Sequence, residues 1–125
     1  MRIWLFIAAL TGAAAVLLGA FAAHGLSGRL APASLGVFET AARYQMYHAL
    51  AMGLAALAMR GPAARRQARI AAGFFAGGIL LFCGSLYLLA LTGGRAFAFI
   101  TPAGGLAFIL GWFMLAMAAL KLEEP

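Results

Sequence analysis

Hydrophobic residues fill three long stretches of the chain, and a fourth stretch is hydrophobic over most of its length. The stretches 3–23, 70–92 and 102–120 contain no charged residue, whereas 35–59 carries polar residues in its first half. A helix needs about 20 apolar residues to cross about 30 Å of hydrocarbon. The pattern therefore predicts four membrane-spanning helices in a single integral membrane domain that covers residues 1–125.

Turn-forming and capping residues separate these stretches. Ser34, just after Pro32, is a candidate N-cap of the second helix, and Gly61-Pro62 would end it. Gly93-Gly94-Arg95 is typical of a turn, and Thr101-Pro102 predicts the N-cap and first position of the fourth helix. Because the connections are short, neighbouring helices should be antiparallel. The expected fold is an all-α, four-transmembrane-helix up-down-up-down bundle.

The first stretch has a competing interpretation as a cleaved signal peptide. Arg2 would supply the short basic region, and Ala20-Phe21-Ala22 resembles a cleavage site. The apolar run is longer than the hydrophobic region of a typical signal peptide. The sequence therefore favours a retained span.

Composition supports a membrane protein. Hydrophobic residues make up 66% of the chain and charged residues 10%, and the mean hydropathy is +1.00. Soluble domains are about half apolar and about a quarter charged, so an ordinary soluble domain is excluded. The single cysteine, Cys83, rules out an intrachain disulfide and a multi-cysteine metal site, and it is expected to be a small core residue.

Basic residues divide unequally between the two ends of the predicted bundle. Six fall at the end that carries both termini and three at the opposite end. The first set is Arg2, Arg60, Arg65, Arg66, Arg69 and Lys121, and the second is Arg29, Arg43 and Arg95. Cytoplasmic loops carry the excess of Lys and Arg, which predicts both termini and the 60–69 loop in the cytoplasm. No basic run is interleaved with aromatic residues, so nucleic acid is not an expected partner.

Small residues recur at helical spacing in the apolar stretches. Gly73 and Gly77 form a GxxxG motif, and Ala15, Gly19 and Ala23 repeat every fourth position. Small residues let helix backbones approach closely in lipid. Two interpretations stay open: tight packing within one bundle, or a seam between the copies of a homo-oligomer.

The second stretch is unusual because charges lie close to its apolar part. Arg43 and Arg60 bracket 16 uncharged residues, which span about 24 Å as a helix against a hydrocarbon core of about 30 Å. Arg43 should therefore lie at the outer interface or just inside it. Glu39 precedes Arg43 by four residues, an order that favours an ion pair.

Polar residues of this stretch form a candidate site. Glu39, Arg43 and Tyr47 share one helix face, Tyr44 and His48 lie on a second face, and Gln45 projects from a third. A charge that faces lipid costs several kcal/mol, so we expect these groups to gather inside the bundle near the outer leaflet, together with His24 at the end of the first helix. The candidate residues are His24, Glu39, Arg43, Tyr44, Gln45, Tyr47 and His48.

Three segments together resemble a known family. They are GAFAAHGL at 19–26, FETA at 38–41 and YQMYHAL at 44–50. With the order of the four stretches, they are similar to the YgdD-like family of small four-helix inner-membrane proteins of unknown function. The departure is Ala22, where that family more often has glycine. The resemblance implies a multi-pass protein of the bacterial inner membrane or of an organelle, and it implies no reaction, substrate or cofactor.

Enzyme signatures are missing from the sequence. It has no aspartate, no HExxH, no P-loop and no GxGxxG, and Glu39 is the only glutamate outside the tail. The leading hypothesis is therefore a non-enzymatic protein whose polar cluster binds a lipid, a small ligand or another membrane protein. The first alternative is a redox protein that uses His24 and His48 as ligands to haem or a metal ion. The second is a small transporter that works as an oligomer.

Overall fold

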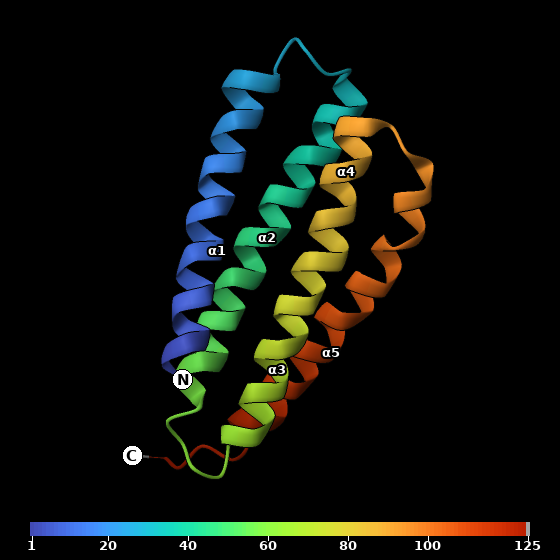
Figure 1. Ribbon diagram of the computed structural model, residues 1–125. Helices are drawn as coiled ribbons and strands as arrows, with labels where there is room; N and C mark the ends of the chain where they lie inside the picture. Colours follow the sequence, from blue (N-terminus) through green and yellow to red (C-terminus); the bar gives the residue numbers. More distant parts are fainter. Residues whose placement is uncertain (125) are drawn as a thin grey trace.

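Over residues 1–124, which the computed structural model describes, the chain folds into four long helical segments joined by short loops (Figure 1). The segments are α1 (Arg2–Phe21) with a π-helical turn η1 (Ala22–Leu26); α2 (Pro32–Ala58); α3 (Arg65–Gly78) with a second π-helical turn η2 (Ile79–Cys83) and α4 (Gly84–Thr92); and a 3₁₀ turn η3 (Arg95–Phe99) followed by α5 (Thr101–Ala119). The prediction of an all-helical chain is confirmed.

Successive segments run in opposite directions, as Figure 1 shows. Both termini and the loop between α2 and α3 lie at one end, which we call the terminal end, and the other two connections lie at the far end. α2 lies between α1 on one side and the α3–α4 rod on the other. Its position explains why ten of its 27 residues are buried, whereas α1 buries only Ala8 and Ala15.

Three of the four segments within residues 1–124 are long and apolar enough to cross a membrane: Arg2–Leu26, Arg65–Thr92 and Arg95–Ala119. α2 is the exception, although its length of 27 residues would suffice. Its polar residues between 39 and 48 reduce its hydropathy. A helix shielded by its neighbours has less contact with lipid, so it tolerates such residues better.

Helix starts differ from the predicted ones. α2 begins at Pro32 with Ala31 at the N-cap position, so Ser34 lies inside the helix and caps nothing. α5 begins at Thr101, with Ile100 at the N-cap position. Proline fits the first turn because its fixed φ suits a helix and its missing N–H would have no partner there. α3 begins at Arg65, five positions before the predicted span, because arginine is a good helix former.

The main core is built from alanine and a few large side chains. Phe75, Met52 and Cys83 are its largest fully buried residues, and the burial of Cys83 confirms the core interpretation. A smaller core at the far end joins Ala22, Leu26, Phe38 and Ala90. Alanine lets the helix axes approach, and the aromatic rings fill the remaining space.

α5 packs against α3 and η2 through glycines that leave no room for a side chain. A Cβ at Gly104 would overlap the backbone N of Phe82, and one at Gly111 would lie 2.7 Å from the ring of Phe75. In contrast, a Cβ placed at Gly73 or Gly77 would have no atom of residues 1–124 within 4 Å apart from its chain neighbours and the backbone of its own helix. The predicted GxxxG motif therefore does not pack inside this chain.

Candidate functional site

Gln45 connects three helices from the middle of α2. Its Nε2 donates to the carbonyl O of Thr11 in α1 at 2.9 Å, and its Oε1 accepts from the hydroxyl of Tyr87 in α4 at 2.7 Å. The side chain is buried. A buried amide with both ends paired avoids the cost of an unsatisfied polar group, and it fixes the positions of α1 and α4 relative to α2.

His48 faces the opposite way, toward α5. Its Nδ1 lies 2.7 Å from the carbonyl O of Tyr44, and its Nε2 accepts from the indole N–H of Trp112 at 3.2 Å. A carbonyl only accepts and an indole N–H only donates, so the ring is the neutral tautomer with its proton on Nδ1. The buried ring stacks on Phe108 with centroids 3.5 Å apart. Both ring nitrogens are therefore occupied by the protein itself.

A third polar contact joins α4 to α5 at the far end. The hydroxyls of Ser85 and Thr101 lie 2.6 Å apart, and Ser85 Oγ also donates to the carbonyl O of Phe82 at 2.9 Å. This pair was not part of the predicted site. Two isolated hydroxyls at matching depth in otherwise apolar helices were the only signal that could have indicated it.

The predicted polar residues do not form a single cluster. Gln45 and His48 are buried but point to different helices. Three others are exposed on the far half of the molecule: His24, Glu39 and Arg43. Within residues 1–124 the expected pair of Glu39 with Arg43 is not formed at 4.0 Å or less.

The two tyrosines of the predicted site lie beside these groups on α2. Tyr44 stacks on Phe82, with ring centroids 4.9 Å apart, and Tyr47 is 50% exposed. Tyr44 is therefore at the boundary between the protein interior and the surface, next to His48.

Shared metal ligation by the two histidines has no geometric support. His24 lies exposed in η1 at the end of the first segment, and His48 uses both ring nitrogens in contacts with Tyr44 and Trp112. Among residues 1–124, no group of three or more His, Cys, Asp or Glu side chains is arranged to hold a metal ion.

A groove of about 510 Å³ lies between α2 and α5, directly over His48. We call it the α2–α5 groove. Its lining is mainly aromatic and apolar, and consists of Tyr44, His48, Phe82, Pro102, Gly105, Leu106, Phe108, Ile109 and Trp112. Two residues of the predicted site, Tyr44 and His48, therefore share one surface depression with Trp112.

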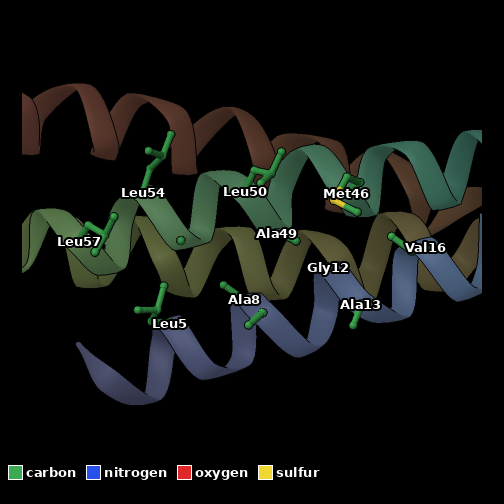
Figure 2. A pocket seen from close by; sticks show the side chains of 12 residues that line it. Leu5, Ala8, Gly12, Ala13, Val16, Met46, Ala49, Leu50, Leu54 and Leu57 are labelled. Carbon is green, nitrogen blue, oxygen red and sulfur yellow. The ribbon is translucent and has the colours of Figure 1, made fainter.

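A second groove of about 470 Å³ lies between α1 and α2 (Figure 2). Small residues form its floor, among them Ala8, Gly12 and Ala49, and leucines such as Leu5 and Leu54 stand along its sides. We call it the α1–α2 groove. It contains none of the predicted site residues, so it offers shape without polar recognition.

Known proteins are similar to this chain over almost its whole length. The family described as "Protein of unknown function (DUF423)" matches residues 18–105. A UPF0382 membrane protein of Staphylococcus epidermidis is 41% identical over 121 residues, covering 97% of this chain and 98% of the relative.

Two further relatives come from other bacteria. The UPF0382 membrane protein YwdK of Bacillus subtilis is 39% identical over 121 residues, covering 97% of this chain and 98% of the relative. The UPF0382 inner membrane protein YgdD of Escherichia coli is 40% identical over 129 residues, covering 98% and 93%. No solved structure matches the chain.

Proposed function

Since the chain belongs to the DUF423, or UPF0382, family of membrane proteins of unknown function, as its resemblance to YgdD-like proteins predicted, we propose that it is a four-span inner-membrane protein that binds the acyl chain of a lipid. The binding site is the α2–α5 groove. The proposal keeps the non-enzymatic, lipid-binding hypothesis and replaces the single polar cluster by one groove built around His48.

All four helical segments cross the membrane in this proposal, including α2. Its 27 residues would extend roughly 40 Å at 1.5 Å per residue. The polar groups of its middle that face inward, Gln45 and His48, have their hydrogen bonds inside the protein. The terminal end, with six of the nine basic residues, faces the cytoplasm.

The observation that carries the binding proposal is the internal pairing of His48. Its Nε2 is occupied by Trp112 and its Nδ1 by the carbonyl of Tyr44. The groove above it therefore exposes aromatic rings and aliphatic side chains, and an apolar chain can lie there without leaving a polar atom unpaired. Tyr44 lines the groove and is 37% exposed, so its hydroxyl is available to donate to the polar end of a lipid.

The test fills the groove and counts the retained lipids. Leu106 lines the groove and is 57% exposed, so Leu106→Trp should occupy the groove without disturbing the core. Leu110 on the same helix is 39% exposed and lies outside the groove lining, which makes Leu110→Trp the matched control. Native mass spectrometry of the full chain, released from a mild detergent, gives the number and mass of bound lipids.

We expect wild type and Leu110→Trp to retain a lipid that Leu106→Trp loses. Equal retention in all three proteins, or retention in none, would refute binding in this groove. An absorbance spectrum and metal analysis of the same sample test the redox alternative: a stoichiometric haem or metal that is lost in His24→Ala or His48→Ala would replace the lipid proposal.

A further inference from the structure

The terminal end of the bundle contains a depression lined by arginines. It has a volume of about 390 Å³ and is lined by Met1, Met59, Arg60, Arg65 and Arg69. A neighbouring depression of about 340 Å³ shares Arg65 and Arg69 and adds Arg66. The Nε of Arg65 donates to the carbonyl O of Met59 at 3.2 Å, which holds this guanidinium beside the end of α2. We call this region the arginine pocket.

Arg65 and Arg66 lie at the N-terminus of α3, where the helix dipole disfavours cations, although Arg65 also donates to the carbonyl end of α2. Arg65 and Arg66 open α3, Arg69 follows one turn later, and the first turn has no acidic residue. The N-terminus of a helix is the positive end of its dipole, where cations are disfavoured and phosphate groups are stabilised. The excess of Lys and Arg in cytoplasmic loops explains why these residues are basic. It does not explain why they line a common depression.

We propose that the arginine pocket binds a phosphate group, supplied by the head group of an anionic phospholipid or by free phosphate. Planar guanidinium groups pair with two oxygens of a phosphate at once, and Arg60, Arg65 and Arg69 approach one depression from two segments of the chain. The pocket lies at the end of apolar helices, at the level where a bilayer presents its phosphates. This site is separate from the α2–α5 groove, because the two share no lining residue.

The acidic tail begins beside the loop between α2 and α3, where its carboxylates would compete with phosphate for the arginines. A Cβ at Gly61 would lie 2.9 Å from Leu122, so the C-terminal residues lie beside the loop that precedes the pocket. Glu123 and Glu124 follow directly and are exposed. Glu123→Gln with Glu124→Gln should therefore leave phosphate binding intact or increase it.

The test compares two lipids with identical tails. The full chain in mild detergent is offered phosphatidylglycerol and phosphatidylcholine in equal amounts, and bound lipid is measured by native mass spectrometry. We expect wild type to prefer the anionic lipid by about fivefold or more, because both head groups carry a phosphate but the choline of phosphatidylcholine adds a cation that the arginines repel. The triple variant Arg60→Gln/Arg65→Gln/Arg69→Gln should lose this preference, and Arg29→Gln/Arg95→Gln at the far end should keep it.

A second triple variant separates phosphate recognition from charge and folding. Arg60→Lys/Arg65→Lys/Arg69→Lys keeps the charge that sets topology but loses the two-pronged geometry, so its preference should fall between the other two. Millimolar inorganic phosphate identifies the source: an increase in thermal stability with phosphate alone assigns the pocket to the free anion, and a response to phosphatidylglycerol alone assigns it to the lipid. Equal binding of both lipids with no response to phosphate, or an unchanged preference in the Gln and Lys variants, would overturn the proposal.

Discussion

Two seams between helices in this bundle use glycine for opposite purposes. Where α5 meets α3 and η2, a Cβ at Gly104 would overlap the Phe82 backbone, and the glycine positions face aromatic rings. Where α1 meets α2, a Cβ at Gly12 would lie 3.9 Å from Ala49 and Met46, and one at Gly53 would lie 3.9 Å from Ala8. At Gly104 and Gly111 the first seam leaves no room for a Cβ, whereas at Gly12 and Gly53 the second seam has that room.

The difference shows two ways of holding helices together in lipid. Lipid tails are as apolar as leucine, so association depends on van der Waals contact and interhelical hydrogen bonds. The α3–α5 seam interlocks rings with glycines. The α1–α2 seam combines small residues with one polar contact, from Gln45 to the carbonyl of Thr11, and it borders the α1–α2 groove.

The largest effect should come from adding one carbon to the tight seam. Gly104→Ala places a Cβ against the backbone N of Phe82, where no flexible side chain can move aside. We expect a loss of about 3 kcal/mol in the free energy of unfolding, measured by titrating a denaturing detergent into mixed micelles. Gly105→Ala is the control, because its Cβ would meet only the Phe82 ring at 3.8 Å; equal losses in both variants would contradict the tight seam.

The polar contact of the open seam should have an intermediate effect. Gln45→Leu removes both hydrogen bonds of the side chain and leaves the Tyr87 hydroxyl without its acceptor. We expect the free energy of unfolding to fall by about 1–2 kcal/mol in the same titration. Tyr87→Phe removes one bond and should cost less than Gln45→Leu. A Gln45→Leu protein as stable as wild type would show that apolar contact alone holds α1.

Much of this arrangement could be predicted from the sequence, but not which small residues touch. The apolar stretches predicted the helical segments, and the polar residues of α2 drew attention to Gln45 and His48, whose side chains make hydrogen bonds between helices. The GxxxG motif at 73–77 suggested a seam, yet the close approaches are made by Gly78, Gly104 and Gly111. Helical spacing groups residues by face, and it carries no information on which partner each face meets.

The two π-helical turns account for part of the remaining difference. A π turn widens the helix by one residue, which rotates every later side chain by about 100° relative to a regular 3.6-residue pattern. η2 precedes Ser85 and Tyr87, so their faces could not be read from regular periodicity. The contact of His48 with Trp112 joins residues 64 positions apart, and this pairing depends on how α5 is rotated against α2.

The smallest effect should come from the same substitution in the open seam, and its sign should be reversed. Gly12→Ala introduces a Cβ that makes ordinary contacts with Ala49 and Met46, and alanine is favoured over glycine inside a helix. We expect a gain of about 0.5 kcal/mol in the free energy of unfolding, measured beside Gly104→Ala under identical conditions. If Gly12→Ala instead destabilised the protein as much as Gly104→Ala, the α1–α2 seam would be as tightly packed as the α3–α5 seam. Opposite signs would show that Gly104 cannot be replaced by a larger residue at its helix contact, whereas Gly12 can.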